Sequence, residues 1–298
     1  MPENASRSLA VACSAGGFKG IFVHGVLSSL EAAGVRANAY AAASSSVFPS
    51  ICAVIRQAGE VGLRYWRSAL GTLEQPGNGM SEVVLASIAE SGSTLLSLLF
   101  RQDAPRFFIA TSAVKTIEGA EQSQGDGARR LGRRLLLQAA RGDRSWADEH
   151  LRAHLFDSAA SDEEHLLTID NIKEVIYAST RMLHAWTIPA WIDGHPYIDA
   201  SYTCACPAVE MAQAGYGEVI AVATEPGELY RDIFGSEPIP DVWEGAPIYV
   251  IRPERDLVGM GVNFTEVSEE GMVKVYEYGM EKGKEFVDYS RLMRRYTS

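Results

Sequence analysis

The sequence predicts an α/β fold with a central, mainly parallel sheet flanked by helices. Residues Leu9–Cys13 form a short apolar run typical of a buried strand. A glycine-containing turn follows, and then a helical segment in which Ile21, Val26, Leu27 and Leu30 recur at near-helical spacing, with Gly34 as its expected C-terminal cap. A second apolar run at 37–43 completes a strand, helix and strand unit. Strands that are joined through a helix in this way run parallel.

Length and composition limit the possible classes of protein. The 298 residues are 47% hydrophobic and 22% charged, which suits one folded domain over residues 1–298. The net charge of −11 argues against a nucleic-acid binder. Residues 1–8 are polar and resemble no signal peptide, and no apolar run approaches the length of a membrane span. Four cysteines are too few for a disulfide scaffold, so we expect a reduced, cytoplasmic protein.

The remaining elements follow in order along the chain. Apolar periodicity predicts a helix over 51–70, a mostly helical segment over 81–100 that is interrupted around Gly92, and a strand at 106–111. An Asp-Gly pair between alternating apolar runs is typical of a β-hairpin turn. The second half of the chain predicts strands at 154–157, 218–223 and 248–251, helices at 171–179, 207–214 and 268–295, and a hairpin at 188–199.

Residues 118–153 differ in composition from their surroundings and predict a helical insertion or lid. Six arginines fall within 129–144, together with a single acidic residue, Asp143. On a helix, Leu131 and Leu135 lie on one side while arginines lie on another. This pattern fits either a transient contact with an anionic membrane surface or a solvated helix whose arginines pair with the acidic remainder of the chain.

Ser44 is the candidate nucleophile. It follows the second predicted strand, and every residue in the window 42–46 is small. A serine in a sharp turn from a strand into a helix needs small neighbours, because the turn crowds the backbone. Centring the window on either following serine would place Val47 or Phe48 in the crowded part. A plain polar turn of three serines is the structural alternative.

Gly16 and Gly17 are candidates for an oxyanion hole. Acyl transfer needs backbone N–H groups that point toward the developing oxyanion, and consecutive glycines before a helix can present them with little steric cost. The same turn could hold a nucleotide phosphate, but the sequence meets neither the dinucleotide fingerprint nor the P-loop pattern.

The histidine positions bear on how a serine could be activated. All of them precede Asp199, so the usual order of serine, acid and histidine cannot use Asp199 as its acid. Either another acid serves, or the base is itself a carboxylate. Structural roles are favoured for His24 and His195. The histidines are His24, His150, His154, His165, His184 and His195.

Taken together, the pattern resembles the patatin-like phospholipases and acyl hydrolases. Residues 15–20, AGGFKG, are similar to the glycine-rich oxyanion turn of that family, with alanine in place of the leading glycine. The window 42–46 is similar to its G-x-S-x-G elbow, with alanine and serine in place of both glycines. The segment 197–201 is similar to its D-G-G or D-G-A motif, with both residues after the aspartate changed. The similarity covers 9–59 and 169–223.

The resemblance implies a patatin-like three-layer fold and a serine acyl hydrolase that cleaves an acyl ester, such as a lipid, through an acyl-enzyme. It assigns Ser44 and Asp199 as a catalytic dyad, Gly16 and Gly17 as the oxyanion hole, and Lys19 as a residue that orients the turn. It implies no cofactor and no metal.

Three alternatives stay open at this point. The same dyad could serve an acyltransferase or an amide-forming biosynthetic enzyme. The altered glycines could also belong to a catalytically inactive homologue that works as a binding module. Finally, a conventional triad could use one of the histidines that precede Asp199.

Overall fold

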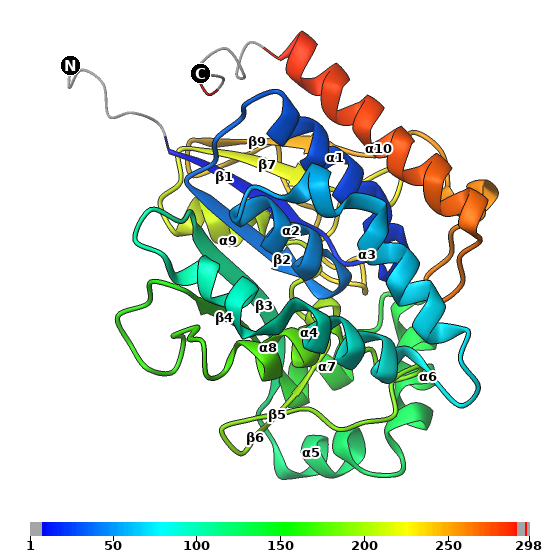
Figure 1. The fold of residues 1–298 in the computed structure, drawn as a ribbon. Coiled ribbons are helices and arrows are strands. Elements are labelled where there is room, and N and C mark those ends of the chain that lie inside the picture. The colour runs from blue at the N-terminus through cyan, green and yellow to red at the C-terminus, as the bar shows by residue number, and fades with distance from the viewer. Residues whose placement is uncertain (1–7, 291–295, 297–298) are drawn as a thin grey trace.

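The computed structural model describes residues 8–290 and 296, and its centre is one nine-stranded sheet. The strand order is β5-β6-β3-β2-β1-β7-β9-β8, and β4 also pairs with β3. Figure 1 shows these strands running through the middle of the molecule. The strands are β1 (Leu9–Cys13), β2 (Ala39–Ala43), β3 (Arg106–Val114), β4 (Leu151–Asp157), β5 (Trp191–Ile192), β6 (His195–Ile198), β7 (Glu218–Val222), β8 (Val242–Trp243) and β9 (Ala246–Ile251).

The sheet is mixed, so the prediction of a mainly parallel sheet is wrong. The strands β3, β2, β1, β7 and β9 are parallel to one another. The strands β4 and β6 run antiparallel to β3, β5 runs antiparallel to β6, and β8 runs antiparallel to β9. Short hairpin strands extend the sheet on both sides of its parallel centre. Strands of two residues, such as β5 and β8, are too short to show the alternation of apolar and polar residues that predicts a strand.

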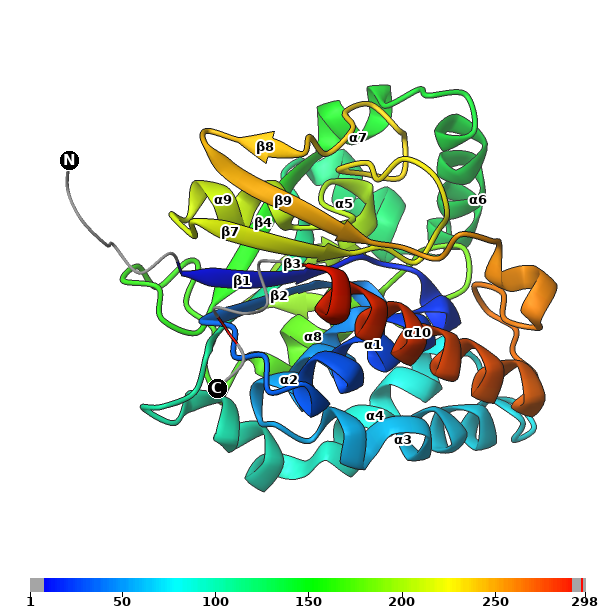
Figure 2. The same ribbon diagram turned by 90° about the horizontal axis from the view of Figure 1, so that it is seen from above.

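Helices cover both faces of the sheet. Figure 2 shows α1, α2, α3, α4 and α10 on one face and α9 on the other. Apolar residues of α9, including Val209 and Met211, pack with Ala10 and Ala12 of β1. The helices are α1 (Gly20–Ala32), α2 (Val47–Val54), α3 (Ala58–Leu73), α4 (Met80–Ser97), α5 (Ile117–Gln124), α6 (Ala128–Ala139), α7 (Ser145–His150), α8 (Ile172–Thr180), α9 (Ala208–Gln213) and α10 (Glu269–Tyr289).

Most of the expected elements are present, with two differences. The predicted helix over 51–70 is two helices, because α2 ends at Val54 and Arg56 takes a left-handed conformation with φ 60° before α3 begins. The predicted helix over 268–295 is present as α10, and its last predicted turn, 291–295, lies outside the described residues.

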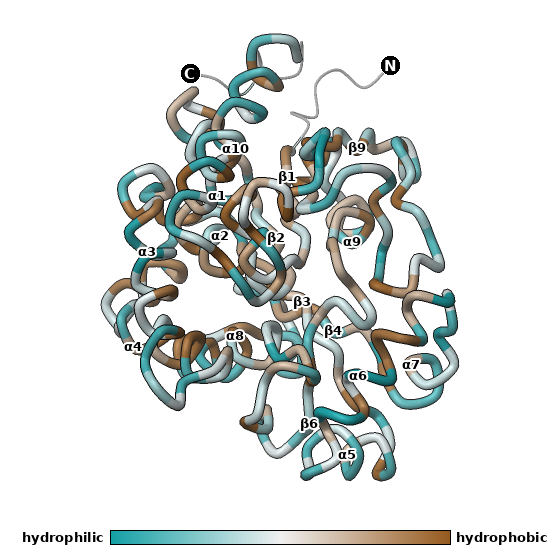
Figure 3. The backbone as a smooth tube through the Cα atoms, turned by 90° about the vertical axis from the view of Figure 1, so that its right-hand side faces the viewer, coloured by the Kyte–Doolittle hydropathy of each residue, from teal (hydrophilic) through white to brown (hydrophobic). Residues whose placement is uncertain are grey.

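Helix α4 contradicts the expectation that no segment has the length and composition of a membrane span. Together with the turn that follows it, it covers Met80–Phe100 and is long and apolar enough to cross a membrane. Figure 3 shows brown, hydrophobic segments in α4. The helix is kinked at Gly92, and 33% of its most apolar window is buried inside the protein. A single helix of this kind is weak evidence for a membrane span, because core helices of soluble proteins share its length and apolar composition.

Strands β2 and β6 meet end to end along one edge of β3. The last residue of β2, Ala43, pairs with Ala110, and the last residue of β6, Ile198, pairs with Ser112 only two positions further along β3. Because β2 and β6 run in opposite directions on the same edge, the residues that follow them emerge at the same place. These residues are Ser44 and Asp199.

Candidate active site

Ser44 and Asp199 form a buried hydrogen-bonded pair. The Ser44 hydroxyl donates to Asp199 Oδ2 over 2.7 Å, and the two residues are 2% and 0% exposed. Ser44 has φ 53°, a conformation that non-glycine residues adopt at a cost, and it starts the turn between β2 and α2. The predicted elbow at Ser44 therefore has the strained strand-to-helix geometry that is typical of a nucleophile elbow.

Two further serines hold the pair in place, and the sequence did not point to them. The Ser44 N–H donates to Ser179 Oγ over 3.0 Å, and the Ser179 hydroxyl donates to the Ala110 carbonyl over 2.7 Å. The Ser112 hydroxyl donates to the Asp199 carbonyl over 2.7 Å. Ser179 lies on α8 and Ser112 on β3, outside both motifs, so the packing of α8 against β3 and the pairing of β6 with β3 bring them to the site.

The Asp199 carboxyl group is held from both sides. Its Oδ2 accepts from Ser44, and its Oδ1 accepts from the N–H of Ser201 over 2.8 Å and from the Ser201 hydroxyl. Burial raises the pKa of Asp199 from 3.8 to about 6, against the opposing effect of the hydrogen bonds from Ser201 and Ser44. The raised pKa makes this carboxylate a stronger base than an exposed aspartate.

The glycine turn leaves two N–H groups free. Within residues 8–290, neither Gly16 nor Gly17 donates its N–H to another group, whereas the Phe18 N–H donates to the Phe264 carbonyl over 3.0 Å. Gly17 has φ 58°, and a Cβ there would lie 2.1 Å from the Phe264 carbonyl oxygen. At Gly16 a Cβ would lie 2.7 Å from Thr224. Both positions therefore need glycine, and their N–H groups are available to a ligand.

Lys19 connects the glycine turn by ion pairs to the segments that follow β7 and β9. Its ammonium group lies 2.6 Å from Glu225 Oε1 and 3.6 Å from Asp256 Oδ1, and the residue is 7% exposed. Glu225 comes shortly after β7, which is a strand that pairs with β1. This ion pair restrains the turn against the carboxyl end of the sheet.

The two residues that stand where the elbow usually has glycines are accommodated. Ala42 is fully buried within β2. Ser46 is also fully buried, and its hydroxyl donates to the Ser14 carbonyl over 2.5 Å. Ser14 directly precedes the glycine turn, so the serine in place of a glycine connects the elbow to the candidate oxyanion hole.

Two cavities adjoin the site. A cavity of about 30 Å³ is lined by Ser44, Gly17 and apolar side chains of α2, α3 and α4. A cavity of about 250 Å³ is lined by Gly16, Ser201 and Phe264, among other residues. The smaller, apolar cavity lies beside the serine, and the larger one lies beside the turn and the residues that hold Asp199.

No histidine in the described part of the chain forms a hydrogen bond with Ser44 or Asp199. His24 is buried, donates from Nε2 to the Ala58 carbonyl over 3.0 Å, and accepts at Nδ1 from Trp66 over 3.0 Å. Burial lowers the pKa of His24 to about 4, so it is neutral and holds α1 against α3. His195 is exposed in the β5–β6 hairpin.

Comparison with protein-family models and with curated protein sequences finds no match for this chain. The assignment of a function therefore depends on the residues and the geometry of the site.

Proposed function

We propose that this protein is a patatin-like serine acyl hydrolase that cleaves an acyl ester, with a lipid as the expected substrate class. The observation that carries the proposal is the 2.7 Å hydrogen bond from the hydroxyl of a strained, buried serine, Ser44, to the buried carboxyl group of Asp199. The order of the three motifs and the two free N–H groups of Gly16 and Gly17 support the same reaction class.

In the proposed reaction, Asp199 accepts the proton of Ser44 as Oγ attacks the ester carbonyl carbon. The N–H groups of Gly16 and Gly17 stabilise the oxyanion that forms. The intermediate collapses to the acyl-enzyme, and the leaving alcohol takes the proton from Asp199. Water then attacks the acyl carbon, Asp199 accepts a proton from it, and the acid is released as Ser44 regains its proton.

The cavity sizes suggest how the parts of the substrate are placed. The cavity of about 30 Å³ beside Ser44 is apolar and suits the start of an acyl chain. The cavity of about 250 Å³ beside Gly16 has room for a leaving group or for an acceptor other than water. An acyltransferase or an amide-forming enzyme with the same dyad is therefore the second candidate function.

We also propose a transient contact with an anionic membrane surface, through the exposed face of α6. Of the six arginines at 129–144, only Arg144 pairs with carboxylates within the described residues, namely Asp148 and Asp232. The other five are exposed, and Leu136 and Leu137 are 38% and 62% exposed beside them. Exposed arginines and leucines on one helix are typical of helices that lie at a membrane interface.

The central test is covalent labelling with a fluorophosphonate probe, which reacts with activated serines. We expect the wild type to be labelled and to hydrolyse a chromogenic short-chain ester. Ser44→Ala removes the attacking oxygen and should abolish labelling and lower kcat by at least about 10³-fold.

Ser45→Ala is the matched control, because Ser45 lines the same small cavity and its hydroxyl has no hydrogen-bond partner among the described residues. It should keep both labelling and turnover. Labelling that survives Ser44→Ala and disappears in Ser45→Ala would overturn the assignment of the nucleophile. A correctly folded wild type that takes no label would favour an inactive binding module instead.

A further inference from the structure

A third pocket lies at the opposite end of the central strands from Ser44. It has a volume of about 130 Å³ and lies where α1 and α2 end and β2 and β3 begin. Its lining residues are Glu31, Gly34, Val35, Arg36, Ala37, Tyr40, Ala53, Arg56 and Pro105. The proposed reaction uses none of them, so the pocket has no role in the chemistry at Ser44.

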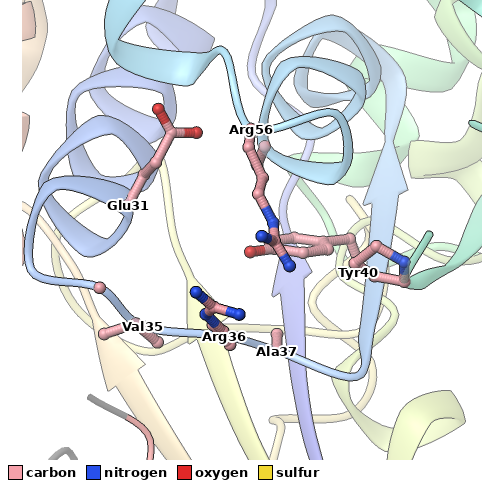
Figure 4. Close-up of a pocket in the computed structure, with 9 residues that line it drawn as sticks. Glu31, Val35, Arg36, Ala37, Tyr40 and Arg56 are labelled. Atoms are coloured by element: carbon pink, nitrogen blue, oxygen red, sulfur yellow. The ribbon is translucent and has the colours of Figure 1, made fainter. Parts of the chain in front are cut away.

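Two guanidinium groups converge in this pocket. Figure 4 shows the side chains of Arg36 and Arg56 pointing into the same space beside the Tyr40 ring. Within the part of the chain that the structure describes, neither guanidinium forms an ion pair or a side-chain hydrogen bond with the protein. Both arginines are exposed, so water screens the repulsion between their charges, and an anion between them would accept hydrogen bonds from both guanidinium groups.

Tyr40 supplies a third donor. The residue is 8% exposed, and its hydroxyl has no hydrogen-bond partner among residues 8–290 and 296. In Figure 4 the hydroxyl points toward the two guanidinium groups. Burial raises the pKa of Tyr40, which keeps the hydroxyl protonated and able to donate.

The one acidic residue of the pocket is already engaged elsewhere. The Glu31 carboxylate accepts from the N–H groups of Ala58 and Gly59 over 3.0 and 3.4 Å. It points away from the guanidinium groups, toward the start of α3, in Figure 4. The three charged side chains leave the pocket with a net positive charge.

The backbone at Arg56 shows that an arginine stands where a glycine would be less strained. Helix α2 ends with a hydrogen bond from the Gln57 N–H to the Cys52 carbonyl, and Arg56 takes φ 60° between them. Helix α1 ends with the same pattern, but the equivalent residue there is Gly34, with φ 77°. The helix dipole stabilises a cation at any position of the last turn. It therefore does not explain why an arginine occupies the position with the strained, left-handed backbone.

We propose that this pocket binds a phosphate or phosphomonoester group, held between the guanidinium groups of Arg36 and Arg56 with the Tyr40 hydroxyl as a third donor. Guanidinium groups donate paired hydrogen bonds to phosphate oxygens, and a cavity of about 130 Å³ has the volume of roughly four waters. The site is independent of the proposed reaction at Ser44.

The test measures thermal stability and calorimetric binding at constant ionic strength. Inorganic phosphate and glycerol 3-phosphate should each raise the Tm of the wild type by at least about 2 °C relative to chloride, because a ligand that binds only the folded state stabilises it. Acetate should raise it less. A larger effect of glycerol 3-phosphate would identify a phosphorylated metabolite or headgroup as the ligand, and equal effects would identify free phosphate.

Three variants make the test specific. Arg36→Gln and Tyr40→Phe should each lose most of the phosphate-dependent shift. Arg56→Gly should lose it as well, while its Tm in chloride rises because glycine relieves the strained conformation. Arg64→Gln, an exposed arginine outside the pocket, should keep the full shift. The proposal is overturned if phosphate leaves the wild type unchanged, if Arg36→Gln and Arg56→Gly keep the full shift, or if acetate stabilises as strongly as phosphate.

Discussion

At the scale of single residues, Asp199 combines a role in the proposed reaction with a cost to stability. The carboxyl group is fully buried, and no cation pairs with it within the described residues. Its pKa rises to about 6, so below that pH the group is protonated and cannot accept the proton of Ser44. Above it, the folded protein holds a charge that burial disfavours.

We expect kcat/KM to rise with pH through an apparent pKa of about 6, because the free enzyme needs the deprotonated carboxylate. A pH–rate profile on a soluble ester measures this. A profile that is flat between pH 5 and pH 8, with a stable protein throughout, would contradict the assignment of Asp199 as the base.

The same group should make folding stability depend on pH. Its pKa is 3.8 when unperturbed and about 6 in the folded state, so between those values the folded state binds more protons than the unfolded state. Stability therefore falls as the pH rises through this range, and the loss is complete above pH 6. Asp199→Asn should abolish turnover and raise the free energy of unfolding at pH 8 by up to about 3 kcal/mol.

Urea unfolding at pH 8 measures the effect of Asp199→Asn on stability. Asp193→Asn is the control, because Asp193 is exposed in the hairpin turn and should change neither activity nor stability. Equal stability of Asp199→Asn and the wild type at pH 8 would mean that burial does not penalise the charge.

At the scale of elements, α3 and α4 determine the room beside Ser44. Tyr65 and Trp66 of α3 and Met80, Val83 and Val84 of α4 line the cavity of about 30 Å³. A space of that size holds about one water-sized group, so it favours a short acyl chain.

Met80→Ala should lengthen the acyl chain that the protein accepts. Met80 is 8% exposed and lines the cavity, so its truncation opens space beside the serine. We expect the ratio of kcat/KM for octanoate to that for butyrate esters to rise by about 10-fold. Leu85→Ala, which removes an exposed side chain of the same helix, should leave the ratio unchanged. An unchanged ratio in Met80→Ala would show that the acyl chain lies elsewhere.

The sequence predicted local elements well and their pairing less well. The run at Leu9–Cys13, the turn at Gly16 and Gly17, and the hairpin around Asp193 carry strong local signals, and all appear as expected. The break at Arg56 was missed because a helix usually ends at glycine in that conformation. Antiparallel partners of β3 were missed because pairing depends on contacts distant in sequence.

The candidate site could be predicted from the sequence only in part. Ser44 and Asp199 were identified from short motifs, but Ser179 and Ser112 have no sequence signal, because each contacts this pair through a hydrogen bond between segments that are distant in sequence. The contact between Ser201 and Asp199 could have been predicted from the sequence. An aspartate whose side chain accepts from the N–H two residues later is a common turn, and Asp199 and Ser201 form one.

At the scale of the whole molecule, charge is distributed unevenly. The chain has a net charge of −11, yet α6 exposes four arginines that form no ion pair within the described residues, and Arg141 lies just beyond the C-cap of the helix. This asymmetry would orient the protein at an anionic surface, with α6 toward the membrane and the acidic remainder away from it.

Flotation with vesicles tests this orientation. We expect the protein to float with phosphatidylglycerol vesicles at low salt, and less at high salt or with phosphatidylcholine alone. The double variant Arg130→Glu and Arg134→Glu should lower the bound fraction at least about 10-fold. The same charge change at Arg64 and Arg101, two exposed arginines outside α6, should have a smaller effect. Equal losses in both double variants would show a response to net charge alone.

Because β2 and β6 meet on one edge of β3, the hydrogen bond between Ser44 and Asp199 forms only when both strands keep their register on β3. A slip of β6 by one residue would move Asp199 by about 3.3 Å and turn its side chain to the opposite face of the sheet. An insertion or deletion within β6 therefore cannot adjust the separation of Ser44 and Asp199 in small steps. The proposed reaction requires that β6 keeps its register on β3, so only side chains can adjust this site finely.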